Sequence, residues 1–254
     1  WDGFSADYHF INFENYISMF HNKDLWLSLR NNAVYFVIHL FMILVELAFA
    51  VLLTSKLRAA KFYKTMVFLP YIINGVAISY AFSYFFSPIN GAFNGILTAL
   101  HLESLIRNWL SDEKIVNFVL ASVSVWRFSG YHVILFMAAL ASIPNELLEV
   151  ARLESATPLQ TFFYIKIRYL SSTFLFVTIM SLISSFKIFR EIYLLTTDYP
   201  YDSIYMLQHF MNNKFKSLDY QTLSAAAILM SLVMVVIIGL LFAVENHFGK
   251  DVEG

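Results

Sequence analysis

Ionisable side chains are rare in the apolar stretches of this 254-residue chain, and those that occur there are candidates for function. Glu46, Arg127 and Lys187 each fall inside a run of apolar residues. A charged group is costly inside a membrane, so it usually faces the protein interior or a water-filled cavity. We interpret these residues either as lining a path for a solute or as partners in contacts between helices. Lys187 could also extend toward a membrane interface.

Nucleophilic and metal chemistry have little support in the sequence. Ser129-Gly130 followed by His132 is the nearest approach to a Ser–His pair, which an intramembrane hydrolase would need. No motif accompanies it, and we interpret His132 as a packed or interfacial residue. The seven His residues lack metal-ligand spacing, and there is no cysteine. We therefore expect no catalytic residue, metal or cofactor in this chain.

The composition places the chain in a membrane. Hydrophobic residues make up 59% of it and charged residues only 14%, which is too apolar for an ordinary soluble domain of this length. With 17 Lys and Arg against 18 Asp and Glu, no basic field is available to attract nucleic acid. We expect membrane lipid, and not nucleic acid, among its partners.

The predicted fold class is an all-α polytopic membrane protein. A spanning helix needs about 20 predominantly apolar residues. Five stretches of the chain meet this requirement: 32–53, 65–86, 115–140, 170–194 and 222–244. Residues 1–30 have no continuous apolar run, so we expect an extracytoplasmic segment there, followed by a transmembrane domain over 31–254. The chain starts at Trp1, and we expect a missing first span, which would make six.

Orientation depends mainly on one basic loop. The segment 54–64, "TSKLRAAKFYK", contains four basic residues and no acid. Short loops rich in Lys and Arg stay on the cytoplasmic side. Alternation of the spans then places residues 143–167 and the C-terminal tail inside as well.

The segment 143–167, "IPNELLEVARLESATPLQTFFYIKI", interrupts the apolar runs with three glutamates, an Arg and a Lys. Pro144-Asn145 and Thr157-Pro158 are both plausible helix starts, because Thr can cap a helix and Pro is tolerated at its first position. We therefore predict two short helices with a break near 155–158. Such a pair could lie along the membrane and present small and acidic groups to a soluble partner, or it could be only an amphipathic connector.

This segment resembles the "EAA" signature of the permease subunits of binding-protein-dependent ABC importers. The signature runs E-A-A-x-x-D-G-A, with Phe and Ile-x-Leu-Pro farther on. Residues of this chain that match it are Glu149, Ala151, Ala156, Phe162 and Ile165. Five further positions depart from it: Val150 for the first Ala, Glu154 for the Asp, Ser155 for the Gly, Ile167 for the Leu and Arg168 for the final Pro. Replacement of the Gly bears most on the turn, because Gly permits backbone conformations that Ser resists.

Other segments resemble the sugar-permease branch of the same family, of maltose or glycerol-phosphate type. They are the stretch at 61–97, "WRFSGY" at 126–131 and "FKIFREIYLLT" at 186–196. The branch has an Asp where this chain has Arg190, which is a departure. The resembling elements cover nearly the whole chain and occur in the family's order.

The resemblance implies a type I ABC importer permease fold in a bacterial cell membrane. It implies a second permease subunit, two cytoplasmic ATPase subunits that bind ATP and Mg²⁺, an extracytoplasmic solute-binding protein and a carbohydrate substrate. The chain itself has no G-x-x-x-x-G-K-[ST] loop and so no ATPase site of that type. Residues 143–167 would couple the ATPases to the spans, through Glu149, Ala151, Glu154, Ser155 and Ala156.

A sugar path would use aromatic faces beside amide and hydroxyl groups, because a pyranose has an apolar face and a hydroxylated rim. Our candidates on the spans are Asn74, Tyr84, Trp126, Arg127, Ser184 and Lys187. The alternative is that such side chains face lipid or pack between helices. Two other transport functions stay open: import of a non-sugar solute on the same scaffold, and ion-coupled secondary transport, which should show internal repeats.

Overall fold

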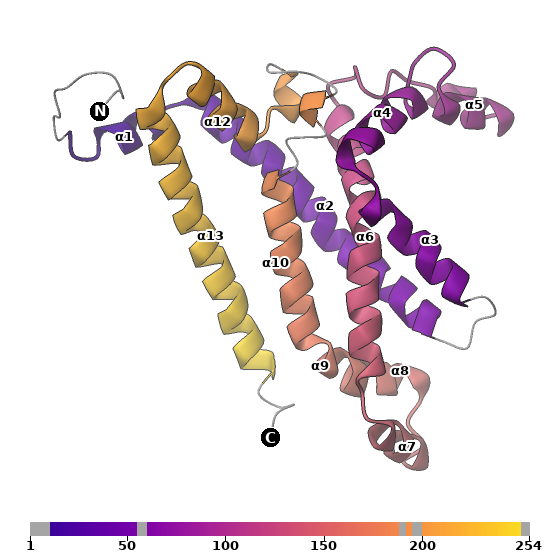
Figure 1. Ribbon diagram of the computed structural model, residues 1–254. Helices are drawn as coiled ribbons and strands as arrows, with labels where there is room; N and C mark the ends of the chain where they lie inside the picture. The colour runs from indigo at the N-terminus through magenta and orange to yellow at the C-terminus, as the bar shows by residue number, and fades with distance from the viewer. Residues whose placement is uncertain (1–10, 55–59, 188–191, 195–199, 250–254) are drawn as a thin grey trace. The chain divides into compact units, whose positions relative to one another are not determined.

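A computed structural model of the chain describes residues 11–54, 60–187, 192–194 and 200–249. Within these ranges the regular structure is helical, without a strand. The all-α prediction is confirmed. The α-helices are labelled in Figure 1 and run as follows: α1 Glu14–Phe20, α2 Lys23–Thr54, α3 Ala60–Ile72, α4 Gly75–Phe85, α5 Ala92–Ala99, α6 Val116–Ala141, α7 Asn145–Leu153, α8 Pro158–Thr161, α9 Ile167–Tyr169, α10 Ser171–Lys187, α12 Leu207–Lys216 and α13 Tyr220–Gly249.

Three helices among the described residues are long and apolar enough to cross a membrane without a break. They are α2, α6 and the part of α13 up to Asn246. Two further spans result if Lys61–Ile72 with Gly75–Phe85, and Pro158–Tyr169 with Ser171–Phe186, each count as one bent span. The five predicted spans correspond to these five. The first begins earlier than predicted, because α2 starts at Lys23.

The predicted span over 65–86 is broken in the structure. α3 ends at Ile72, and α4 begins at Gly75 with Asn74 as its N-cap. The Asn74 side-chain oxygen accepts a hydrogen bond from the Val76 amide at 2.8 Å. An Asn side chain at the start of a helix can accept a hydrogen bond from a backbone amide that has no partner within the helix. This local bond favours the start of α4 at this point over the continuation of α3.

The described chain divides into two compact units. The first comprises the described parts of Trp1–Ile38, Ile73–Val125 and Ile183–Val233, and the second those of His39–Ile72, Trp126–Leu182 and Met234–Gly254. Long helices such as α2 and α6 contribute to both units. Each unit has its own buried core, and each is described separately below.

A buried amide clamp holds the first unit together. The Asn32 side chain is fully buried; its nitrogen donates to the Ser185 carbonyl at 2.6 Å and its oxygen accepts from the Leu207 amide at 2.8 Å. The neighbouring Asn31 donates to the carbonyls of Asp202 and Tyr205. These contacts join residues far apart in the sequence, and each satisfies a buried polar group.

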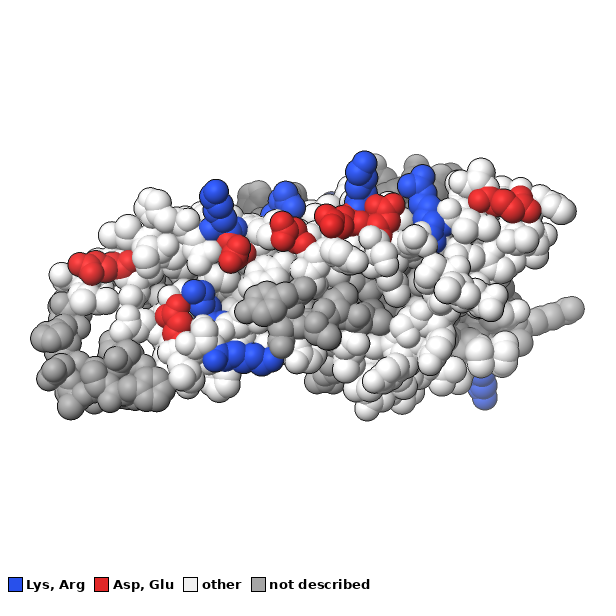
Figure 2. Space-filling view, turned by 90° about the horizontal axis from the view of Figure 1, so that it is seen from above, with Lys and Arg blue, Asp and Glu red and all other residues white. Residues whose placement is uncertain are grey.

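The surface of the first unit carries charges of both signs in close contact. Lys214 pairs with Asp219 at 3.0 Å, and Arg107 lies 3.9 Å from Asp112. Figure 2 likewise shows acidic and basic side chains next to one another on the face that it views. That face has no broad area of a single sign, as the near-neutral composition predicts.

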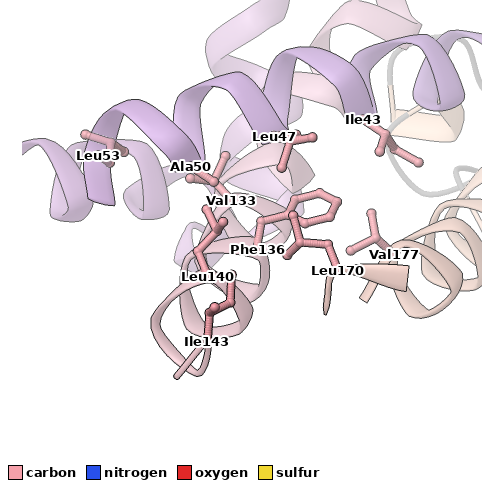
Figure 3. Close-up of a cluster of buried hydrophobic side chains, with 10 residues drawn as sticks. All are labelled: Ile43, Leu47, Ala50, Leu53, Val133, Phe136, Leu140, Ile143, Leu170 and Val177. Atoms are coloured by element: carbon pink, nitrogen blue, oxygen red, sulfur yellow. The ribbon is translucent and has the colours of Figure 1, made fainter. Parts of the chain in front are cut away.

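The second unit is built around apolar side chains from α2, α6 and α10. Figure 3 shows Ile43 and Leu47 of α2, Phe136 of α6 and Val177 of α10 converging with the residues around them. Phe136 is fully buried, and its ring lies 5.0 Å from that of Phe174. Dispersion and burial of these side chains hold the three helices together.

Close backbone contact joins α3 to α6 in this unit. A Cβ atom at Gly130 would lie 1.9 Å from the Val67 carbonyl oxygen, so only Gly fits. One turn away, the rings of Tyr71 and Tyr131 stack at 4.9 Å with 13° between their planes. Small residues allow this kind of approach between helices in a membrane.

Candidate coupling segment and intramembrane cavity

Residues 145–161 form the two predicted short helices. α7 begins at Asn145 after Pro144, and α8 begins at Pro158 after Thr157, as predicted. Figure 1 shows both between the end of α6 and α9. We call residues 145–161 the coupling segment.

The turn between α7 and α8 is a Schellman motif centred on Ser155. The Ala156 amide donates to the Ala151 carbonyl at 2.9 Å, and the Ser155 amide donates to the Arg152 carbonyl at 3.0 Å. Ser155 has a φ of 58°, the left-handed conformation that favours glycine. The turn that a Gly would form is therefore present here with Ser, at some cost in backbone strain.

α8 starts with a capping box. The Thr157 hydroxyl accepts from the Gln160 amide at 3.3 Å, and the Gln160 side-chain oxygen accepts from the Thr157 amide at 2.8 Å. This reciprocal pair satisfies two helix-terminal donors. A π-helical turn, Phe162–Lys166, follows, and Pro158–Tyr169 then meets Ser171–Phe186 at 64°. π-Turns are rare and recur at functional sites.

The coupling segment has an inner and an outer face. Ala151 is buried, while Leu148 of α7 and the following Phe162 and Ile165 pack against the core of Figure 3. The outer face exposes apolar side chains: Val150 (54%), Leu153 (84%) and Leu159 (70%), with Phe163 (61%) and Tyr164 (69%) just beyond it. Several large apolar side chains exposed within one short segment make it a candidate interaction site.

The five predicted coupling residues take different positions in this segment. Glu149 and Glu154 are exposed, Ser155 is exposed at the turn, Ala156 is half-buried and Ala151 faces inward. The two alanines thus hold the turn close to the unit's core, and the two acids lie on the outside. The sequence did not single out Leu153, although it is among the most exposed apolar side chains of the described chain.

A cavity of about 270 Å³ lies in the second unit among α2, α3 and α6. Its lining is mainly apolar, with Glu46, Ser129 and the indole of Trp126 as the groups that can form hydrogen bonds: Met42, Val45, Glu46, Phe49, Met66, Val67, Pro70, Trp126, Ser129 and Val133. This volume lies just below the roughly 300–1,000 Å³ of typical small-molecule sites, so it would hold only a small ligand or part of a larger one. Glu46 contacts a second buried group, because Oε2 lies 3.0 Å from Nδ1 of His132. Glu46 is 1% exposed and His132 2%.

The predicted path residues fall in different parts of the chain. Trp126 lines the cavity and is 44% exposed, and Arg127 places its guanidinium 5.2 Å from the centre of the Phe128 ring. Asn74 and Tyr84 lie on the first unit, both exposed, and Ser184 is half-buried there. The Lys187 side chain and Arg190 lie outside the described residues. Of these candidates, the structure brings only Trp126 to the cavity.

The Ser–His hypothesis receives no support from the geometry. The Ser129 hydroxyl faces the Trp126 carbonyl at 3.5 Å, whereas His132 binds Glu46. His132 is packed, as one of our interpretations predicted. In the ranges that the structure describes, no three His, Cys, Asp or Glu residues are grouped so that they could hold a metal ion.

Known proteins resemble this chain over most of its length. The sequence profile described as "Binding-protein-dependent transport system inner membrane component" matches residues 26–254. The probable ABC transporter permease protein YurN of Bacillus subtilis is 30% identical over 99% of this chain and 87% of its own length. The lactose transport system permease protein LacF of Rhizobium radiobacter is 30% identical over 78% of this chain and 68% of its own length.

The fold also matches a solved structure. A chain of the bacterial alginate ABC transporter, crystallised with an alginate-bound periplasmic protein, superposes with a TM-score of 0.83 at 21% identity, covering 94% of this chain and 84% of that one. The likeness supports the type I permease fold predicted from the sequence. By its sequence and its fold, the chain belongs to the family of binding-protein-dependent transport system inner membrane components, the membrane-spanning permease subunits of ABC importers.

Proposed function

We propose that this chain forms part of the translocation path for a carbohydrate, an oligosaccharide in particular, in an ATP-driven importer. The importer class follows from family membership. The carbohydrate is supported by relatives named for sugars, including the lactose permease and the permease for arabino-oligosaccharides AraP, which is 31% identical over 72% of this chain. The resemblance of residues 61–97 and 126–131 to sugar permeases points the same way.

The coupling segment is the observation that carries the proposal. Its outer face combines exposed Leu153, Val150 and Leu159 with the acids Glu149 and Glu154. Water solvates such apolar side chains poorly, and a partner surface would remove them from water at a gain of about 25 cal/mol per Å². The partner we propose is a cytoplasmic ATPase subunit. Closure of the ATPases on ATP would then move the two helices, and the second unit with them.

The remaining parts of the importer come from other chains. Two ATPase subunits would bind ATP and Mg²⁺, since this chain has no phosphate-binding loop of the Walker type. A second permease subunit would complete the path, and an extracytoplasmic solute-binding protein would deliver the sugar. We place the assembly in a bacterial cell membrane, with the coupling segment on the cytoplasmic side.

The proposed path residues have unequal support. Trp126 lines a cavity, and an indole face can stack on the apolar face of a pyranose. Asn74, Tyr84, Arg127, Ser184 and Lys187 stay predictions that depend on the resemblance. Asn74 has a structural role in capping α4, independent of any contact with solute.

Reconstitution tests the proposal. The chain, co-expressed with its partner permease and ATPase subunits, should purify as a complex. In proteoliposomes, with the cognate binding protein, one or a few oligosaccharides from a panel should stimulate ATP hydrolysis. Stimulation by amino acids or peptides and by no sugar would contradict the carbohydrate assignment. A chain that purifies alone and transports without ATP would contradict the importer assignment.

A further inference from the structure

The cavity contains a buried carboxylate that is only half satisfied. Oε2 of Glu46 is bound to His132, while Oε1 is buried and has no hydrogen-bonding partner among the described residues. A buried acceptor without a donor is unfavourable, because it has lost its hydrogen bonds to water and gained none in return. Such a group within a membrane protein points to a donor that the chain itself does not supply.

The rest of the cavity wall limits what that donor can belong to. The lining is otherwise apolar except for the Ser129 hydroxyl and the indole of Trp126, which is 44% exposed. A ligand that fits must therefore combine apolar surface with hydrogen-bond donors. A sugar does so, because its C–H face can lie on an aromatic ring while its hydroxyls donate to a carboxylate.

The charge of the cavity lining disfavours acidic sugars. Among the described residues that line the cavity there is no Lys or Arg. The ionisable side chain among the described lining residues is that of Glu46, and one of its carboxyl oxygens already contacts His132. An anionic solute would find no opposite charge there and would lose its hydration in an apolar cavity. A cation would find only one carboxylate, already shared with His132.

We propose that this cavity is a binding site for an uncharged, polyhydroxylated solute, with Glu46 Oε1 accepting a hydroxyl hydrogen and Trp126 packing against the sugar face. The inference rests on the proposed function and adds selection against acidic sugars by the permease itself. It distinguishes this chain from the alginate transporter that shares its fold, which imports an acidic polysaccharide.

The absence of cysteine from the chain allows a direct test. In the Ser129→Cys variant a thiol would line the cavity, and in the Ser111→Cys control a thiol would be placed at an exposed residue outside it. The purified assembly is treated with a water-soluble methanethiosulfonate, and labelling of this chain is followed by mass spectrometry. The probe is the oligosaccharide that most stimulates ATP hydrolysis by the wild-type assembly.

We expect that sugar to slow the labelling of the Ser129→Cys variant and to leave the Ser111→Cys variant unchanged. Addition of Glu46→Gln to the Ser129→Cys variant should raise the sugar concentration that halves the labelling rate about tenfold, the effect of one hydrogen bond to a charged group. Glycerol phosphate and uronate oligosaccharides should give no protection.

Three results would overturn the inference: a Ser129→Cys thiol that the reagent never reaches, one that the stimulating sugar does not protect, or protection by acidic sugars. In each case the stimulated ATP hydrolysis would still stand, so the proposed function would survive. If no sugar stimulates the wild-type assembly, the proposed function fails first and the inference fails with it.

Discussion

The amide of Ala156 donates a 2.9 Å hydrogen bond to the carbonyl of Ala151 across a turn in which Ser155 adopts a φ of 58°. This bond fixes the angle at which α7 ends and the chain turns toward α8. It makes the coupling segment a shaped element with an inner face on the core and an outer face in solvent. A rigid element can transmit a displacement, whereas a flexible loop would absorb it.

Replacing Ser155 with Gly should strengthen this turn. A residue other than Gly is destabilised by about 1–2 kcal/mol in the left-handed region. Gly removes this strain from the folded state, but part of the resulting stabilisation is offset because Gly also gives the unfolded chain more conformational freedom. A net gain of about 1 kcal/mol corresponds to about fivefold slower hydrogen exchange at the Ala156 amide. Exchange measured by mass spectrometry checks this, with Ser155→Val expected to change it in the opposite direction. Equal exchange in all three proteins would mean that the turn is not formed.

Replacing Gly130 with Ala should destabilise the second unit severely. The new Cβ would lie 1.9 Å from the Val67 carbonyl oxygen, so α3 and α6 must separate. Overpacking of this kind costs about 1–3 kcal/mol or more. Thermal unfolding in detergent measures the loss.

Gly95→Ala is the matched control, because a Cβ there meets nothing within 4 Å. Gly95 lies inside α5, where Ala is favoured over Gly by up to about 1 kcal/mol. Its unfolding temperature should stay the same or rise. If Gly130→Ala behaved like Gly95→Ala, the close contact of α3 with α6 would be refuted.

The buried Asn32 side chain should contribute more to the free energy of unfolding than an exposed Asn side chain does. Asn32→Ala removes the donor to the Ser185 carbonyl and the acceptor for the Leu207 amide, and it leaves that buried N–H without this partner. We expect a loss of about 2–4 kcal/mol in the free energy of unfolding, from two buried hydrogen bonds. Asn108→Ala, at an exposed residue, should change it by less than about 0.5 kcal/mol. Comparable losses in the two variants would argue against the clamp.

The features predictable from the sequence were those encoded locally. Thr157 with Pro158 specifies a helix start within four residues, and the apolar runs specify spans, so both were recovered. The left-handed turn at Ser155 could be inferred only through the resemblance to a family that has Gly there. The break at Asn74 was missed because hydropathy remains high across it and one side-chain bond decides the local structure.

Contacts between distant residues were out of reach of the sequence alone. Glu46 and His132 are separated by 86 residues, and neither pattern nor spacing indicates that they meet. Glu46 was singled out as an ionisable residue in an apolar stretch, with pairing to a neighbouring helix among its interpretations, whereas His132 was singled out only for its spacing from Ser129. The packing of α2 on α6 determines that α6 supplies the partner. It also determines that one carboxylate oxygen of Glu46 has no hydrogen-bonding partner among the described residues.

Reversing the charge of Glu149 should uncouple ATP hydrolysis from transport. Glu149 is exposed on α7, so Glu149→Lys should leave folding and docking of the binding protein intact while it repels a complementary surface on the ATPase. Uptake in proteoliposomes should fall to background. Glu103→Lys reverses an exposed acid of the first unit that is not part of the coupling segment, and it should retain uptake. Normal uptake by Glu149→Lys would remove this residue from the contact.

The central claim is that the coupling segment binds an ATPase subunit on the cytoplasmic side of the membrane. Cross-linking tests this claim most directly. Leu153 is 84% exposed, and the chain has no cysteine, so Leu153→Cys introduces a single thiol on the outer face. Ile89→Cys is the control: this residue is 78% exposed and lies in the loop 88–114, which alternation of the spans from the basic loop 54–64 places outside. In whole cells the account predicts that a membrane-permeant maleimide–benzophenone, attached to the Leu153→Cys thiol and then photoactivated to insert into a C–H bond of its neighbour, joins the chain to the ATPase. A membrane-impermeant thiol reagent should label only the Ile89→Cys chain. Labelling of the Leu153→Cys chain from outside, or its failure to cross-link to the ATPase in an assembled complex, would contradict the account.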